Sequence, residues 1–229
     1  MKKQDTVAII VAAGKGTRMS KKDNKLLLPL GKRTIIEFSL DAFLNHHRIR
    51  KIFLTISSKY REFYENIFPR KIVLVDGGKR RQDSVHNALL KVMQEKKVPE
   101  LILVHDGARP FCSLELIDRV IDSAINYGAS IPVLPLMDTI RIVGKEKTRV
   151  VDRNKLFSVQ TPQGFRSKLL NDASFQAIEK KWEVTDDAAL IERMGGKVKT
   201  VKGEYCNFKI TTPEDLDRAN YILYSNNLL

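Results

Sequence analysis

The sequence has little of what disulfide frameworks and metal sites are made from. It contains two cysteines, Cys112 and Cys206, and four histidines among 229 residues. Two cysteines fit neither a disulfide framework nor a zinc spacing, and the histidines form no metal-ligand pattern with them. A reducing compartment therefore suits the chain, and we expect a cytoplasmic protein. No residue is identified with certainty as a metal ligand.

Long apolar runs are also missing. No run reaches the roughly 18 residues that a membrane-spanning helix needs. The first residues are basic, but the apolar segment after them, Val7–Ala13, is too short for the core of a signal peptide and leads into Gly-Lys-Gly. We therefore expect neither a membrane span nor a secretion signal.

Acidic residues are scarce in the first third of the chain, and most of the net charge of +13 falls there. Residues 1–81 hold 19 lysines and arginines against 7 acidic residues, whereas residues 82–229 hold 21 against 20. Such a local excess indicates a surface that faces an anion. A polyphosphate substrate or a nucleic acid would fit it, and a lysine-rich surface exposed to water is an equal alternative.

What the chain does have is an alternation of short apolar runs with amphipathic segments. The runs are rich in β-branched residues or leucine and are bounded by turn residues, as is typical of buried strands. The segments between them follow helical spacing. This pattern predicts an α/β fold with a doubly wound, mostly parallel sheet, which binds ligands beyond the carboxyl ends of its strands. The expected strands are Val7–Val11, Ile52–Ile56, Ile72–Val75, Leu101–Val104 and Ser130–Val133, and the expected helices are Ile35–Leu44, Asp83–Met93 and Leu114–Tyr127.

A different pattern follows the last of these strands. Two short runs, Thr139–Val143 and Arg149–Val151, flank Gly144-Lys145-Glu146-Lys147 and predict an antiparallel hairpin. An isolated hairpin is only marginally stable in water, so we expect it to pack on a second subunit of a homodimer. Residues 135–158 would form this inserted arm within a single domain of residues 1–229.

Helix start and stop signals occur in both halves of the chain. Thr34 with Glu37 makes a capping box ahead of the first helix. A helix is expected at Lys168–Lys180 and another at Asp186–Met194, the latter capped by Thr185 and stopped by two glycines. A final helix is expected after a Thr-Pro pair, since threonine is a common cap and proline suits the first helical position.

A glycine-rich loop follows the first expected strand. It reads Ala12-Ala13-Gly14-Lys15-Gly16-Thr17-Arg18-Met19, and Lys25 lies shortly after it. Small residues let the backbone approach a ligand, and exposed N–H groups there can bind phosphates that Arg18 and Lys25 would neutralise. A dinucleotide-binding fingerprint would need a third glycine where Met19 stands, and a P-loop would need four residues between Gly and Gly-Lys. The loop therefore predicts a phosphate site of another kind.

At this loop the sequence resembles the methylerythritol phosphate cytidylyltransferases of the non-mevalonate isoprenoid pathway. That family opens with Ala-Ala-Gly-x-Gly-x-Arg-Met and a lysine seven residues after the arginine, which here are Ala12–Met19 and Lys25. The resemblance then recurs in order along the chain. The further segments are Gly77-Gly78 with Arg81 and Asp83-Ser84-Val85, then His105–Pro110, Asp138-Thr139, Val151–Arg153, Thr161–Gln163, Phe165, Thr185-Asp186, Gly203, Asn207, Lys209, Thr211, Pro213–Leu216 and Ala219.

The resemblance implies a Rossmann-like nucleotidyltransferase fold and a reaction. The enzyme would transfer CMP from CTP to the phosphate of 2-C-methyl-D-erythritol 4-phosphate, release pyrophosphate, and need Mg²⁺ or another divalent cation. Arg18 and Lys25 would be the catalytic residues, because they match positions that stabilise charge on the α-phosphate. The attacking phosphate is already ionised at pH 7, so no general base is required.

The resemblance also implies binding residues. Backbone groups of Ala12 and Gly78 with the Ser84 hydroxyl would read the cytosine edge, although Asp83 and Ser84 would also suit a helix N-cap. The backbone of Gly107 would face the ribose. The full nucleotide set is Ala12, Ala13, Gly14, Gly16, Gly78, Asp83, Ser84 and Gly107, and the acceptor set is Asp106, Thr139, Arg153, Thr161 and Lys209.

Several of these residues and their neighbours need separate comment. Asp106 is the one possible metal ligand. Thr139 and Arg153 flank the hairpin, so the resemblance implies that they serve the active site of the other subunit. Arg109 is expected to shape its turn as an ion-pair partner, with ligand contact left open. His105 is expected to be either a hydrogen-bonded strand-end residue or a functional one.

Two departures and two alternatives remain. Asn24 stands where the family usually has proline, which would loosen the catalytic loop, and Arg141 stands where lysine is usual. A ribitol 5-phosphate cytidylyltransferase, of a sister family, is the nearest alternative. A nucleic-acid-binding module is the remote one. The aromatic residues that could stack on bases follow instead the spacing of a helix face that packs in a core, namely Tyr60, Phe63, Tyr64 and Phe68, and no RNA-binding fingerprint is present.

Overall fold

The computed structural model of the chain describes residues 5–14, 24–67 and 71–225. Short 3₁₀ helices are η1 (Lys25–Leu27), η2 (Ser58–Tyr60) and η3 (Arg153–Lys155). The helices are α1 (Ile35–Asn45), α2 (Arg61–Ile67), α3 (Arg81–Met93), α4 (Leu114–Tyr127), α5 (Ser167–Glu179), α6 (Ala188–Arg193) and α7 (Pro213–Ser225). The strands are β1 (Thr6–Val11), β2 (Pro29–Leu30), β3 (Arg33–Thr34), β4 (Ile49–Ile56), β5 (Ile72–Asp76), β6 (Leu101–Asp106), β7 (Ala129–Pro135), β8 (Ile140–Val143), β9 (Thr148–Val151), β10 (Phe157–Val159), β11 (Gln163–Arg166) and β12 (Lys199–Lys202).

The central sheet confirms the predicted α/β architecture. Its strand order is β10-β7-β11-β6-β1-β4-β5, with β12 paired to β7, and β6, β1, β4 and β5 are mutually parallel. All five expected strands form. The short strand β11 was not predicted, because Phe165 is the one large apolar side chain among its four residues. It pairs antiparallel with both β6 and β7 and makes the sheet mixed.

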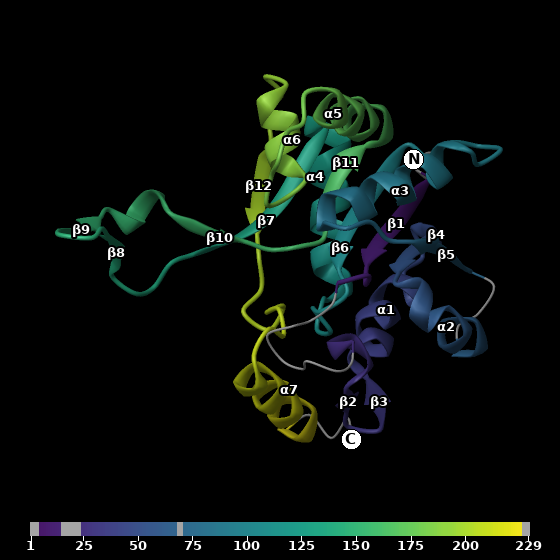
Figure 1. Cartoon of the computed structure of the whole chain (residues 1–229), viewed down its shortest axis with the longest axis horizontal. Helices are drawn as coiled ribbons and strands as arrows, with labels where there is room; N and C mark the ends of the chain where they lie inside the picture. Colours follow the sequence, from purple (N-terminus) through teal and green to yellow (C-terminus); the bar gives the residue numbers. More distant parts are fainter. Residues whose placement is uncertain (1–4, 15–23, 68–70, 226–229) are drawn as a thin grey trace.

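Helices cover both faces of the sheet because its strands are apolar on both sides. Along β1, Ala8 and Ile10 point into one core with α1 and α4, while Val7 and Ile9 point into the other with α3, α5 and α6. This alternation is the period of two that a strand imposes. The result is a three-layer arrangement, in which β6 and β1 lie in the middle of the sheet (Figure 1).

An arm projects from the body where the hairpin was predicted. The strands β8 and β9 pair with each other in a separate two-stranded sheet, which confirms the hairpin, and the arm stands well away from the other elements (Figure 1). Apolar side chains are exposed along and beside it, among them Met137, Val143, Val150 and Phe157. The arm therefore lacks an apolar core within this chain.

Two of the predicted helix caps are wrong. The helix expected at Asp186–Met194 is α6. Gln163 Oε1 accepts from the backbone N–H of Asp187 and of Ala188, both at 3.2 Å, and Asp186 Oδ1 accepts from the Ala189 N–H at 3.1 Å. Thr185 is therefore not the cap. The helix α3 begins two residues before Asp83, which occupies the third helical position and accepts from the N–H of Arg80 at 3.1 Å.

Other helix signals are confirmed. Thr34 and Glu37 form the capping box of α1, and the Thr212 hydroxyl accepts from the N–H of Asp215 at 3.3 Å at the start of α7. Within the described ranges, no helix combines the length and apolarity that crossing a membrane requires.

Candidate active site

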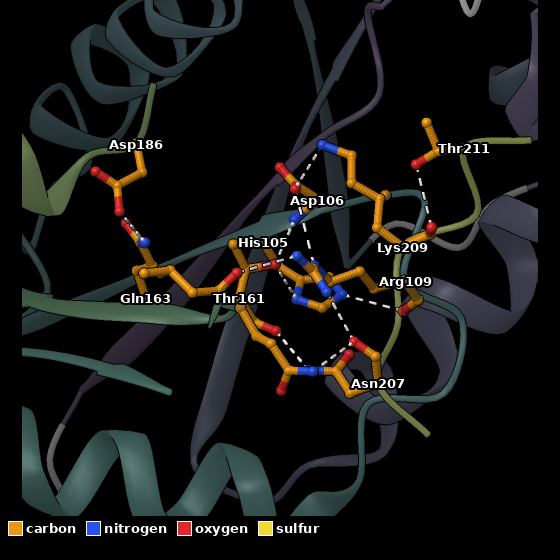
Figure 2. A network of polar contacts seen from close by, with 12 residues as sticks. His105, Asp106, Arg109, Thr161, Gln163, Asp186, Asn207, Lys209 and Thr211 are labelled. Carbon is orange, nitrogen blue, oxygen red and sulfur yellow. Dashed lines mark hydrogen bonds and ion pairs between the residues drawn. The ribbon is translucent and has the colours of Figure 1, made fainter. Parts of the chain in front are cut away.

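Asp106 ends β6 at the edge of the sheet where the parallel strands finish. Its two carboxylate oxygens have different partners. Arg81 Nε lies 3.0 Å from Oδ1. Lys209 Nζ lies 2.8 Å from Oδ2 (Figure 2). Burial by itself would raise the pKa of Asp106, but the charges of Arg81 and Lys209 outweigh it and lower that pKa below its ordinary value. Asp106 is therefore a carboxylate at neutral pH, with each oxygen already paired.

Arg81 joins Asp106 to a second carboxylate. Its Nη1 lies 2.8 Å from Oδ2 of Asp187, a residue that is almost completely buried. Burial raises the pKa of Asp187, and the charge of Arg81 opposes that rise. Arg81 therefore pairs with one oxygen of each carboxylate, in a buried environment where an unpaired charge would be costly. Arg81 matches the family motif, but nothing in the sequence indicated its partner 106 positions away.

His105 and Thr161 form the inner wall behind Asp106. The Arg109 carbonyl lies 3.2 Å from His105 Nε2, and a carbonyl can only accept, so Nε2 carries the proton. The Thr161 hydroxyl therefore donates to the bare Nδ1 at 3.1 Å, and it accepts from the Asp106 N–H at 3.0 Å. Burial lowers the pKa of His105 to about 3. His105 is thus a neutral, hydrogen-bonded strand-end residue, and the hydroxyl proton of Thr161 is committed to it.

Arg109 shapes the turn after β6, as expected. Its Nη1 donates to the Asn207 carbonyl at 2.7 Å, and its Nε lies 3.8 Å from Asp106. The amide of Asn207 in turn donates to the Thr161 carbonyl at 2.8 Å. These contacts fix the segment that carries Lys209 beside Asp106 (Figure 2).

Lys25 reaches the same segment from the opposite end of the sequence. It begins η1 and is half-buried, and its Nζ donates to the Ile210 carbonyl at 2.7 Å. The Ile210 N–H donates to the carbonyl of Ala108 at 2.9 Å, in the turn after β6. Lys25 therefore contacts the residue that follows Lys209, and both lysines lie near the end of one central strand.

The predicted nucleotide residues lie at the ends of the neighbouring strands. Ala12, Ala13 and Gly14 follow β1, and a Cβ built on Gly77 would lie 2.1 Å from the Cβ of Ala13, so only glycine allows the loop after β5 to come this close. The Ser84 hydroxyl accepts from the Gly78 N–H at 3.0 Å and donates to the Arg80 carbonyl at 3.1 Å. The loops after β1 and β5 thus form one wall.

The remaining predicted residues divide into two groups. Gly107 lies against the end of β1, where its N–H donates to the Val11 carbonyl at 3.0 Å. Arg18 and Gly16 lie outside the described residues. Thr139 and Arg153 are exposed on the arm, where Arg153 donates to the Met137 carbonyl, and so they stand apart from the cluster around Asp106.

The doubly wound sheet and the cationic groups at its strand ends define an α/β nucleotidyltransferase. A family model described as 2-C-methyl-D-erythritol 4-phosphate cytidylyltransferase matches residues 6–225. The chain belongs to this family and is therefore a cytidylyltransferase.

Relatives and solved structures of that description cover nearly all of the chain. A cytidylyltransferase of this name from Geobacillus thermodenitrificans is 41% identical over 224 residues, which are 95% of this chain and 96% of the relative. The structure of one from Thermus thermophilus superposes with a TM-score of 0.80 at 35% identity, over 95% of this chain and 98% of that one. The structure of a 4-diphosphocytidyl-2C-methyl-D-erythritol synthase from Anaerococcus prevotii superposes with a TM-score of 0.83 at 32% identity, over 97% of each chain.

Proposed function

We propose that the protein transfers CMP from CTP to the phosphate of 2-C-methyl-D-erythritol 4-phosphate and so contributes to isoprenoid precursor synthesis. The observation that carries the proposal is the meeting of Lys25, Lys209 and Asp106 at the carboxyl end of β6 in a chain of this family. Two ammonium groups offer charge to phosphates, and a carboxylate suits the hydroxyl groups of a polyol.

The chemistry is an in-line displacement at the α-phosphorus of CTP. An oxygen of the acceptor phosphate forms a bond to that phosphorus, while the bond to the oxygen that bridges to the β-phosphorus breaks and pyrophosphate leaves with the electron pair. The nucleophile is already ionised, so the neutral His105 is not needed as a base. Lys25 and Arg18 would stabilise the charge that develops on the α-phosphate.

Mg²⁺ would arrive with the triphosphate as part of the substrate. Among residues 5–14, 24–67 and 71–225, no group of three histidine, cysteine or acidic side chains could hold a metal ion. Both oxygens of Asp106 are paired with cations, so this carboxylate could at most add one ligand. Phosphate oxygens and water would supply the rest of the coordination, as is usual for magnesium.

Cytosine recognition would fall to the wall formed by the loops after β1 and β5. Ala12, Gly78 and Ser84 offer backbone and hydroxyl groups there, and a carbonyl acceptor for the exocyclic amino group is what separates cytosine from uracil. Ala13, Gly14, Gly16 and Asp83 would line the same side, and Gly107 would face the ribose.

The arm would complete the site of a second subunit. Its exposed apolar side chains and its distance from the body support a homodimer in which Thr139 and Arg153 contact the acceptor bound by the partner (Figure 1). Thr161 and Lys209 would lie on the same side as that acceptor within this chain. A cytoplasmic location remains a prediction from the sequence.

Pyrophosphate release with CTP tests the proposal against its nearest alternative. The assay compares 2-C-methyl-D-erythritol 4-phosphate with ribitol 5-phosphate at equal concentrations and includes a reaction without acceptor. We expect kcat/KM to be at least about 100-fold higher for the methylerythritol compound, the discrimination that a polar pocket can achieve. Preference for ribitol 5-phosphate would show that ribitol 5-phosphate is the acceptor. Absence of pyrophosphate release with either compound would contradict the proposed function.

A further inference from the structure

Asn24 lies immediately before Lys25 and is buried, with about 3% of its surface exposed. Its side-chain oxygen accepts from the Leu26 N–H at 3.1 Å, and its side-chain amide donates to the Ala12 carbonyl at 3.4 Å. Its backbone N–H donates to the hydroxyl of Tyr60 at 3.2 Å. One asparagine therefore connects η1, the end of β1 and η2.

These contacts fix the backbone on both sides of Lys25. The Tyr60 hydroxyl anchors the N–H before it, the Asn24 side-chain oxygen anchors the N–H after it, and the Leu27 N–H closes the turn on the Asn24 carbonyl at 2.9 Å. The φ angle of Asn24 is −66°, which is the value that a proline ring imposes. Hydrogen bonds thus hold here a conformation that proline would hold covalently.

We propose that Asn24 and Tyr60 are positioning residues for Lys25, and that they act by fixing the backbone conformation at residue 24. This inference rests on the proposed function, because it assumes that Lys25 serves the α-phosphate. The sequence suggested that an asparagine in place of the family's usual proline would loosen the loop. In the structure, Asn24 makes three hydrogen bonds where proline would have a ring, and these hold residue 24 at the start of η1.

The contribution of positioning residues is measurable because small displacements of a charged group are costly in the transition state. Asn24→Ala should lower kcat by about 10-fold and change KM for CTP by less than about threefold, since misplacement by about an ångström costs up to 10²-fold in rate. Tyr60→Phe, which removes only the acceptor of the Asn24 N–H, should lower kcat by about threefold. Asn171→Ala on α5 and Tyr127→Phe at the end of α4 are the matched controls and should leave kcat unchanged.

Proline at position 24 separates positioning from a direct role of the side chain. Because φ already suits the ring, Asn24→Pro should keep kcat within about threefold of the starting protein. In that background Tyr60→Phe should have no further effect, since proline has no N–H to donate. If Asn24→Pro is as slow as Asn24→Ala, backbone positioning is overturned.

A double-mutant cycle with Lys25→Ala decides whether the effect passes through Lys25. We expect the 10-fold effect of Asn24→Ala on kcat to fall to less than about twofold once Lys25 is alanine. A full 10-fold effect in both backgrounds would overturn the positioning role and leave the proposed function intact.

Two other outcomes concern the assumptions of this inference. A Lys25→Ala protein with normal kcat would overturn both the role of Lys25 and this inference. Absence of pyrophosphate release in the unsubstituted protein would contradict the proposed function itself. Thermal unfolding of each variant identifies any that fail to fold, and Tyr60→Phe and Asn24→Pro then carry the test.

Discussion

Lys209 Nζ lies 2.8 Å from Asp106 Oδ2, although 103 positions separate the two residues in the sequence. The pair closes a chain of charges that runs from Lys209 through Asp106 and Arg81 to the buried Asp187. The charge on each member depends on its neighbours, because the low-dielectric surroundings make any unpaired member unstable. Arg109, whose Nε lies 3.8 Å from Asp106, adds a third cation, so the end of β6 carries a connected group of ions with Asp106 at its centre.

Asp106→Asn tests that balance through stability. The substitution removes the charge that faces Arg81 and Lys209, and we expect the free energy of unfolding in urea at pH 7 to fall by about 2 kcal/mol or more. Asp172→Asn on α5 is the matched control, because its ion pair with Lys168 is exposed and should contribute less than about 0.5 kcal/mol. Equal losses in the two variants would contradict a special role of burial at Asp106.

Lys25→Ala and Arg18→Ala test the catalytic assignment. Each should lower turnover by about 10²-fold or more, the usual cost of removing one group that stabilises transition-state charge. Lys168→Ala, which removes an exposed lysine of α5, should leave turnover unchanged. Thermal unfolding checks that the three proteins remain folded. Near-normal turnover of Lys25→Ala would contradict the catalytic role of Lys25.

The metal and nucleotide requirements form a third test. Activity should disappear in excess chelator and return with Mg²⁺, because the triphosphate needs a divalent cation while the described residues provide no group that could hold one in its absence. CTP should be used better than UTP, ATP or GTP. Initial rates at a fixed acceptor concentration measure both effects, and activity in chelator or equal use of UTP would be incompatible with this account.

His105 predicts a pH dependence of stability. Burial lowers its pKa to about 3, whereas an unfolded histidine titrates near pH 6.5. Between those values the unfolded chain binds the extra proton, so the free energy of unfolding falls as the pH falls, by at most about 1.4 kcal/mol per pH unit from this residue. Well above about pH 6.5 the residue contributes no slope.

Urea unfolding at pH 7.5, 6.5 and 5.5 measures this slope. Burial also lowers the pKa values of His46 and His86, which act in the same direction, so the informative quantity is the difference from His105→Gln. The glutamine variant lacks one titrating group and should lose less stability between pH 6.5 and 5.5, whatever its stability at pH 7.5. Identical slopes would show that His105 takes up a proton in the folded state.

The sequence predicted the elements whose signal is local. Val7–Val11 is a run of apolar residues, as a strand buried on both faces must be, and it forms β1 with one further residue. The strand β11 escaped prediction because its place depends on pairing with β6 and β7, not on its own four residues. Part of the cap of α6 escaped for a similar reason, since Gln163 supplies two of its contacts from another part of the chain, while Asp186 accepts from the Ala189 N–H locally.

In the site, too, the residues that belong to local motifs were predicted and those that depend on distant partners were not. Asp106 and Lys209 came from a resemblance in motifs, and the structure brings them into contact. The roles of Asp187 and Tyr60 could not be predicted, because each depends on one partner far away in sequence and on burial that appears only in the folded chain. The contacts of Asn24 are of the same kind, because two of its partners, Ala12 and Tyr60, are distant in the sequence.

A mixture of two inactive variants tests the arm and the mechanism together. If the arm reaches across a two-fold dimer, Arg153 serves the active site of the partner while Lys25 serves its own. A subunit with Lys25→Ala is mixed and refolded with one that carries Arg153→Ala, and the rate of pyrophosphate release is compared with that of each variant alone.

In the mixed dimer one site has both lesions and the other has neither. Random pairing makes about half of the dimers mixed, each with one intact site, so about a quarter of the normal activity should return. Refolding the unsubstituted protein in the same way gives the reference rate and corrects for losses. If Arg153 acts within its own chain, every site carries a lesion and the mixture is no more active than its components. That outcome would refute the shared site and leave the cytidylyltransferase assignment standing.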